Sequence, residues 1–137
     1  NRIMIPKEPI SQEKSMEIHS LRAEYEFKGE VISSEGTDWT VLYADEEGLA
    51  NPCFSRVIFL RPINDILSVD SYINKKIQSI GLSILDEKQR KEILDKITLK
   101  GGDRCPSLGE MSVFHSPWDG MFSLDRMVRW ITIPRKN

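Results

Sequence analysis

Residues 56–62 have the sequence RVIFLRP. Four consecutive apolar side chains, at 57–60, are preceded by Arg56 and followed by Arg61 and Pro62. A short continuous apolar run of this kind is typical of a strand that is buried on both faces, as in a parallel sheet. We therefore predict a fully buried strand at residues 57–60.

The sequence that follows this run alternates between helix and strand patterns. Apolar residues recur every three or four positions in 66–77, 90–97 and 124–131, which predicts three amphipathic helices. The segments 79–84 and 104–108 lie between them and are predicted to be extended. Right-handed crossovers would place the strands in a mostly parallel sheet covered by helices, so we expect an α/β fold.

The sequence before the run predicts one helix and a pair of strands. Residues 1–10 resemble a connecting segment, since their two prolines disfavour helix. Ser11 is a candidate N-cap for a helix over 14–27. Strands are expected at 30–33 and 37–43, the second on the period-two alternation of its side chains.

Local signals mark several helix ends. Gly29 is a natural stop for the first helix, and Gly101-Gly102 ends a later one. Asp86 with Gln89 resembles a capping box at the start of that later helix. The acidic turn 45–48 is a weak candidate for a metal site, because solvated acidic loops are far commoner.

Composition describes an ordinary globular chain. It has 137 residues, which predicts a single domain over 1–137; 39% are hydrophobic and 29% charged. The net charge of −2 gives no attraction to nucleic acid. No apolar run approaches the ~20 residues that span a bilayer. No secretory signal is visible, but the first residue is Asn1 rather than Met, which leaves targeting open.

Few residues could carry chemistry. Cys53 and Cys105 lie far apart with no CxxC or Cys/His cluster, so we expect reduced thiols, a cytoplasmic location and no zinc site. Cys105 follows an arginine, which can activate a thiol, so a small enzyme using Cys105 stays open as an alternative. His115 near Asp119 could form an orienting pair, although no serine or cysteine is placed to use it.

The turn at 115–120, HSPWDG, follows a Gly-rich stretch at 101–111, GGDRCPSLGEM. Turns that hold His, Trp and Asp usually serve a site rather than a core. His19, in the first helix, has no partner one turn away and is expected to be solvated. Residue patterns alone therefore indicate an α/β domain with a candidate site near 115–120, and they do not specify a reaction.

Four segments resemble the LuxC-type fatty acyl-CoA reductases, which are relatives of the aldehyde dehydrogenases. They are 36–41 (GTDWTV), 56–63 (RVIFLRPI), 77–82 (IQSIGL) and 102–130, which runs from the Gly-x-Asp-Arg motif through Trp-Asp-Gly to Arg-Trp. Each is short, but their order and spacing together are specific. The resemblance covers 36–137 well and is faint over 1–35.

The resemblance implies an aldehyde-dehydrogenase-like three-layer domain with a mostly parallel sheet covered by helices. It also implies an NADPH-dependent reductase. A cysteine thiolate attacks a fatty acyl-CoA or another acyl thioester, coenzyme A leaves, and hydride from NADPH gives the aldehyde. This chain resembles only the part of such a catalytic domain that follows the nucleophile. The catalytic cysteine and the NADPH fold are therefore expected upstream of Asn1, and the fragment alone is expected to be inactive.

The resemblance also suggests roles for four residues. Phe54 matches the phenylalanine that lies beside the nicotinamide in aldehyde dehydrogenases, although the preceding residues 51–53 lack the glutamate that usually holds the ribose. His115, Trp118 and Asp119 match the segment that closes the substrate side, and we expect them to line or brace the acyl entrance. Trp118 packed under the last helix is the competing interpretation.

Other functions stay open at this stage. The rival from another class is a non-catalytic α/β binding or assembly module. A homo-oligomer, or a complex with acyl-transfer enzymes, is compatible with either reading. The acyl-chain length, the choice of NADPH over NADH and any link to bioluminescence are not specified by the sequence.

Overall fold

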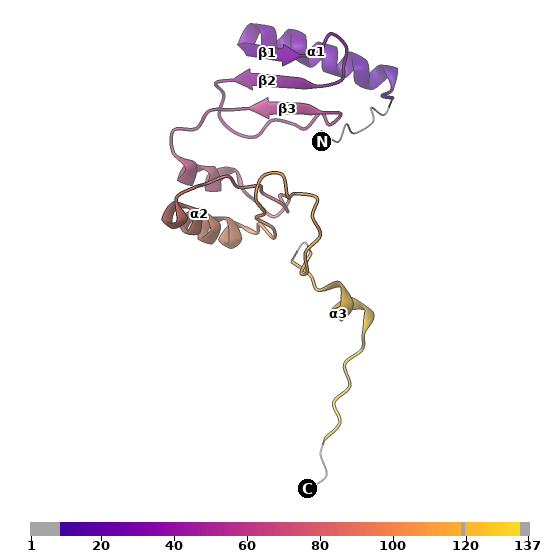
Figure 1. The fold of residues 1–137 in the computed structure, drawn as a ribbon, viewed down its shortest axis with the longest axis vertical. Coiled ribbons are helices and arrows are strands. Elements are labelled where there is room, and N and C mark those ends of the chain that lie inside the picture. Colours follow the sequence, from indigo (N-terminus) through magenta and orange to yellow (C-terminus); the bar gives the residue numbers. More distant parts are fainter. Residues whose placement is uncertain (1–8, 119, 135–137) are drawn as a thin grey trace, which may run out of the picture. The chain divides into compact units, whose positions relative to one another are not determined.

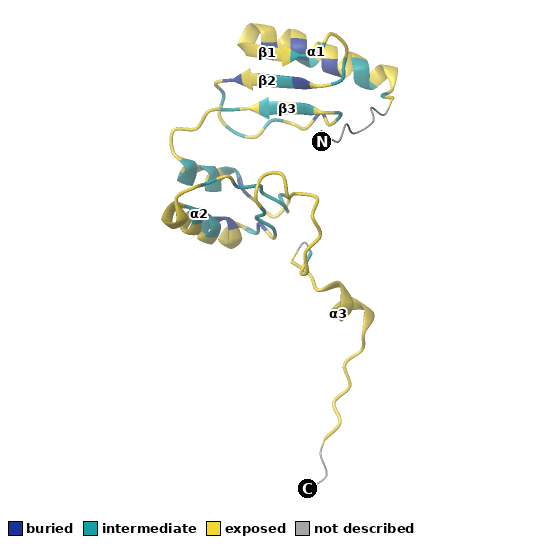
Figure 2. Ribbon diagram, viewed as in Figure 1, coloured by how far each residue is buried: buried dark blue, intermediate teal, exposed yellow. Residues whose placement is uncertain are grey.

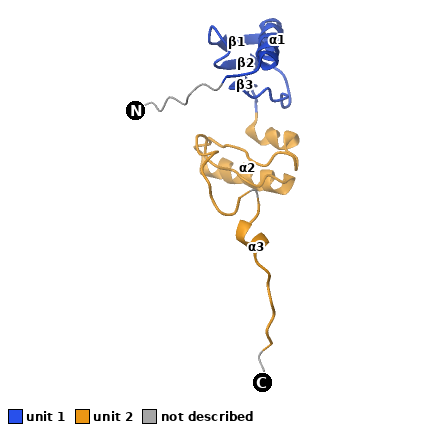
Figure 3. Cartoon of the chain, turned by 90° about the vertical axis from the view of Figure 1, so that its right-hand side faces the viewer, with its two compact units in different colours: residues 1–64 blue, residues 65–137 orange. Residues whose placement is uncertain are grey.

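The computed structural model describes residues 9–118 and 120–134. The chain divides into two compact units, 1–64 and 65–137, which are described separately (Figure 3). Unit 1 contains helix α1 (Gln12–Lys28) and strands β1 (Gly29–Ser33), β2 (Thr40–Ala44) and β3 (Val57–Leu60). Unit 2 contains the 3-10 helix η1 (Ile66–Tyr72) and the helices α2 (Glu87–Lys100) and α3 (Ser123–Met127) (Figure 1).

Helix α1 confirms the first predicted helix and its cap. The Ser11 hydroxyl accepts a hydrogen bond from the Lys14 N–H at 3.1 Å, which satisfies one of the free donors of the first turn. Ile18 and Tyr25 are buried two turns apart on one face, as the spacing predicts. The helix ends at Gly29, whose N–H donates to the Tyr25 carbonyl.

The sheet of unit 1 is mixed, where a mostly parallel sheet is expected in this fold class. Its strand order is β1-β2-β3; β1 pairs with β2 antiparallel, and β2 pairs with β3 parallel. The short turn 34–39 permits only an antiparallel return, whereas the longer connection 45–56 carries the chain back for a parallel pairing. These helices and strands fit the α/β class.

One face of this sheet packs on α1. Leu42 and Ala44 of β2 form a buried cluster with Tyr25, and Val57 and Phe59 of β3 pack against it. The Tyr25 and Phe59 rings lie 5.7 Å apart, centroid to centroid. Alternate residues of each strand therefore point towards the helix, as the pleat requires.

The other face of the sheet, which we call the open face, is mainly apolar. Its apolar residues are Ile32, Val41, Tyr43, Ile58 and Leu60, which are aligned across the three strands by the register; all but the half-buried Val41 are exposed, and Glu30 lies beside Tyr43 at its edge. The prediction that residues 57–60 are buried on both faces is wrong: Ile58 is 55% and Leu60 47% exposed (Figure 2). The run is continuous in sequence, but α1 covers only the face of Val57 and Phe59.

Arg22 ties α1 to the start of β2. Its side chain is buried, and its Nε donates to the Thr40 hydroxyl at 3.0 Å. Its Nη2 donates to the Gly36 carbonyl at 2.8 Å. Buried charged groups need such partners, so this network fixes the β1–β2 turn against the helix.

Unit 2 is built on an aliphatic cluster of Ile73, Ile93 and Ile97. Helix α2 begins as predicted, because the Asp86 carboxylate accepts from the Gln89 N–H at 2.6 Å. It ends at Gly101, whose φ of 100° is the left-handed conformation that favours glycine at a helix C-terminus.

The predicted helix over 66–77 is shorter and tighter than expected. It is a 3-10 helix that ends at Tyr72. The Ser68 and Ser71 hydroxyls donate to carbonyls three residues back, at 2.7 and 2.8 Å. Serine side chains that bond the local backbone in this way compete with regular α-helix, which accounts for the difference.

The predicted strands at 79–84 and 104–108 are reduced to two isolated parallel bridges, Ser79–Arg104 and Leu82–Ser107. The Ile80 N–H donates to the Arg104 carbonyl at 2.8 Å, and the Leu82 N–H donates to the Pro106 carbonyl at 2.9 Å. Pro106 has no N–H to return, so a continuous ladder cannot form across it.

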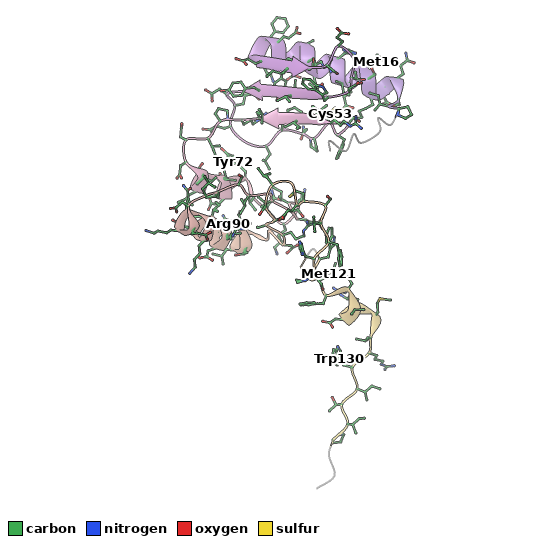
Figure 4. The ribbon with its side chains drawn as sticks, viewed as in Figure 1. Met16, Cys53, Tyr72, Arg90, Met121 and Trp130 are labelled. Atoms are coloured by element: carbon green, nitrogen blue, oxygen red, sulfur yellow. The ribbon has the colours of Figure 1, made fainter. Side chains whose placement is uncertain are left out.

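The last helix is also shorter than the predicted 124–131. Helix α3 stops at Met127, and Val128 is already extended with φ −114° and ψ 156°. The segment 128–133 that follows is exposed and mainly apolar, with Trp130 on it (Figure 4). Its β-branched residues favour extended chain over helix, against the spacing that predicted one.

Candidate functional site

Phe54 begins a strained turn that leads into β3. Phe54, Ser55 and Arg56 have φ angles of 60°, 50° and 61°. Three consecutive non-glycine residues in the left-handed region are unusual and cost free energy at each position. Such strain persists only where the surroundings enforce it, and it concentrates at functional sites. The strained backbone of residues 54–56 therefore supports a functional role for this turn, and no residue pattern in these positions indicates that role.

The turn presents the phenyl ring of Phe54 to solvent. Phe54 is 72% exposed, whereas the adjacent Cys53 is 1% exposed. The Val57 N–H donates to the Phe54 carbonyl at 3.0 Å, and the Thr40 N–H donates to the Arg56 carbonyl at 3.1 Å. An exposed, fixed aromatic face can stack against a planar ring of a ligand.

The residues before Phe54 fit only part of a nicotinamide nucleotide site. The aromatic face is available, but Asn51, Pro52 and Cys53 offer no carboxylate for a ribose. The arrangement thus suits contact with the nicotinamide ring and lacks the carboxylate that usually holds the ribose.

In unit 2, Trp118 is held between two partners. Its ring stacks on Phe114 with centroids 5.2 Å apart and an interplanar angle of 16°. On the Arg104 side, the guanidinium carbon lies 4.0 Å from the Trp118 ring centroid, a cation–π contact. Arg104 also donates to the Met111 carbonyl at 2.6 Å. Trp118 therefore joins the turn to the 104–111 segment.

Of the other two residues predicted for the substrate side, the structure describes His115 but not Asp119. His115 is exposed on the turn. Asp119 lies outside the described residues, so the predicted pair between His115 and Asp119 stays a prediction. The structure adds Arg104, whose contact with Trp118 the sequence did not reveal, although it falls within the Gly-x-Asp-Arg motif.

The two cysteines have environments that disfavour a reactive thiolate. Burial raises the pKa of the Cys105 thiol, and the nearby cation of Arg90 only partly opposes this. Burial also raises the pKa of Cys53, with the Glu17 carboxylate adding to the effect. Neither thiol is in a disulfide, and the raised pKa values favour the protonated form of both. This environment argues against the alternative in which Cys105 is a nucleophile.

The acidic turn 45–48 and His19 show no sign of a metal site in the part of the chain that the structure describes. Glu46 of the acidic turn pairs with Arg61 at 2.9 Å and with Lys28 at 3.4 Å. His19 is exposed and lines an open cleft of 530 Å³ beside Arg22 and Glu26. Within 9–118 and 120–134, no group of three or more His, Cys, Asp or Glu side chains could hold a metal ion. No helix in the same residues is long and apolar enough to cross a bilayer.

Comparison with known proteins relates the chain to a family and to a curated relative. A family model described as acyl-CoA reductase (LuxC) matches residues 1–130. A long-chain acyl-protein thioester reductase from Vibrio harveyi is 27% identical over 135 residues, which cover 96% of this chain. The chain spans 28% of the length of that relative.

Proposed function

The chain belongs to the acyl-CoA reductase (LuxC) family, and from this membership we propose that it is part of an NADPH-dependent fatty acyl-CoA reductase. The match over residues 1–130 carries the proposal, and it includes residues 1–35, where the sequence resemblance is faint. The Vibrio harveyi relative, named for the reduction of long-chain acyl-protein thioesters, supports a long-chain acyl thioester as the substrate class.

We propose that both units belong to the C-terminal part of one aldehyde-dehydrogenase-like catalytic domain with a three-layer arrangement. The nucleophilic cysteine would lie in the remainder of a longer polypeptide. Three observations support this placement of the nucleophile. The chain spans only 28% of the length of the Vibrio harveyi relative, the pKa values of both its cysteines are raised, and it has exposed apolar surfaces. Large exposed apolar patches usually mark surfaces that another part of a protein covers.

The reaction would proceed by covalent catalysis. A cysteine thiolate attacks the acyl carbonyl carbon, the bond from that carbon to the coenzyme A sulfur breaks, and coenzyme A leaves as a thiolate. When bound, NADPH would supply a hydride to the acyl carbon; the bond from that carbon to the cysteine sulfur would break, which releases the aldehyde and regenerates the thiolate. The two free thiols and the small net charge of −2 agree with the proposal that the enzyme is cytoplasmic.

Phe54 would contribute to this reaction by packing against the nicotinamide ring. Its exposure and the left-handed backbone of its turn are the observations that favour this role. His115, Trp118 and Asp119 would line or brace the acyl entrance, with Trp118 as the bracing member because Arg104 and Phe114 hold its ring.

A matched pair of phenylalanine variants tests the Phe54 role in the full-length protein. Phe54→Ala should weaken NADPH binding about fivefold, because it removes one aromatic contact. Phe27→Ala is the control, since Phe27 is 93% exposed at the end of α1 in the same unit. Fluorescence titration with NADPH measures both. Equal affinities for Phe54→Ala and Phe27→Ala would remove Phe54 from the cofactor site.

The alternative is a non-catalytic binding or assembly module. The open face and the exposed apolar segment 128–133 favour it, because such surfaces also suit partners. A full-length protein that binds neither NADPH nor acyl-CoA would support this alternative over the reductase.

A further inference from the structure

The strained turn at Phe54 is fastened differently on its two sides. Downstream, backbone hydrogen bonds tie it to the sheet: the Val57 N–H donates to the Phe54 carbonyl and the Thr40 N–H to the Arg56 carbonyl. Upstream, the turn is preceded by Pro52, which has no N–H to donate, and by Cys53. A left-handed backbone of non-glycine residues relaxes unless both sides are held.

Helix α1 supplies a hold on the upstream side. The Lys14 ammonium group donates to the Cys53 carbonyl at 3.2 Å, across 39 residues of sequence. Lys14 is itself oriented by an ion pair with Glu17, one turn along the same helix. Cys53 is buried, and the exposed Phe54 follows it directly, so the bond from Lys14 acts at the residue where the chain leaves the core.

The electrostatics of the two partners agree with this geometry. The pKa of Lys14 is raised, first by its hydrogen bond with Glu17. The pKa of Glu17 is lowered, first by the same bond. Lys14 is therefore charged throughout the neutral range, and a charged donor forms a stronger hydrogen bond to a carbonyl than a neutral one.

We propose that Lys14 is a positioning residue: by holding the Cys53 carbonyl it fixes the left-handed turn 54–56 and so the direction of the Phe54 ring. The consequence for NADPH binding rests on the proposed function, whereas the consequence for the turn itself does not. Lys14 touches neither substrate nor cofactor in this account and acts only through Phe54.

Three lysine variants of the full-length protein test the proposal. Lys14→Met removes the donor and keeps most of the aliphatic chain, whereas Lys14→Arg keeps a charged donor. Lys28→Met is the matched control, because Lys28 also forms an ion pair within α1, with Glu24, and a second with Glu46, away from the turn. Both substituted positions are partly exposed, so the variants are expected to fold.

The first readout is native cleavage by chymotrypsin after Phe54, mapped by mass spectrometry. Lys14→Met should raise the cleavage rate about tenfold, since local opening of the turn exposes the bond to the protease. The second readout is NADPH affinity, which should weaken about threefold to fivefold in Lys14→Met, no more than in Phe54→Ala. Lys14→Arg and Lys28→Met should stay within about twofold of the parent in both readouts.

The outcomes separate this proposal from the proposed function. If Lys14→Met is cleaved no faster than Lys28→Met, the positioning role of Lys14 is overturned. If Lys14→Met is cleaved faster while Phe54→Ala binds NADPH normally, the positioning role stands and the cofactor role of Phe54 fails. If Phe54→Ala weakens NADPH binding and Lys14→Met does not, the turn keeps its direction without Lys14 and the proposal fails.

Discussion

At the scale of single residues, the structure separates side chains that share a motif. Trp118 and His115 lie three positions apart in HSPWDG, yet Trp118 is half-buried between Arg104 and Phe114 whereas His115 is exposed. If both residues belong to the proposed acyl entrance, they would therefore serve it in different ways. Trp118 can hold the turn in place, and His115 can meet a ligand directly.

Trp118→Ala in the full-length protein tests this division. The substitution removes one aromatic stack and one cation–π contact, so we expect kcat/KM for long-chain acyl-CoA to fall about tenfold and the chain-length preference to broaden. Trp118→Phe retains a ring between Arg104 and Phe114 and should lose less. Rates for acyl-CoAs of different chain length measure both effects. An unchanged profile in Trp118→Ala would leave Trp118 with no part in the acyl entrance.

Some residues could be identified from the sequence and others could not. Ser11, Asp86 and Gly101 act as predicted, because a cap depends on a few neighbouring positions. The role predicted for Phe54 rests on resemblance alone and stays a prediction. The left-handed turn that presents it contains no glycine or asparagine, so no local signal predicts its backbone, and the bond from Lys14 crosses 39 residues.

At the scale of elements, helices with complete local signals were predicted well and strands less well. Helices α1 and α2 carry both caps and an apolar spacing, and both are confirmed. The parallel pairing near Pro106 is reduced to bridges because proline interrupts the ladder. Strand burial depends on what covers each face, which a continuous apolar run cannot reveal, so β3 was wrongly expected to be buried on both faces.

The join between α1 and β1 gives an element-scale prediction. A Cβ atom at Gly29 would lie 2.1 Å from the Tyr43 carbonyl oxygen, so a side chain there opposes the pairing of β1 with β2. Gly29→Ala should lower the free energy of unfolding by about 2–3 kcal/mol, the usual range for overpacking. Urea denaturation followed by circular dichroism measures it.

Gly36→Ala is the matched control in the turn between the same two strands. The nearest atom to its added Cβ is the Asp38 carboxylate oxygen at 3.8 Å, an ordinary contact. We expect a change within about 0.5 kcal/mol, as for most surface substitutions. Equal losses of stability in Gly29→Ala and Gly36→Ala would show that the close approach at Gly29 does not determine the stability of the β1–β2 pair.

At the scale of the whole molecule, two exposed apolar surfaces have to be explained. The open face of the sheet and the segment 128–133 present several large apolar side chains to solvent. The proposed larger catalytic domain would account for both, since its remainder would supply covering surface as well as the nucleophile. The family match and the 28% coverage of the Vibrio harveyi relative support this account.

The most direct measurement maps the acyl-cysteine. The full-length protein is incubated with a long-chain acyl-CoA in the absence of NADPH, digested, and searched for a thioester-linked acyl group by mass spectrometry. We predict one acylated cysteine outside residues 1–137, no acyl group on Cys53 or Cys105, and release of fatty aldehyde once NADPH is added. Two results would contradict this proposal. One is an acyl group on Cys105, together with protection of the Cys105 thiol from alkylation by acyl-CoA. The other is the absence of any acylated cysteine.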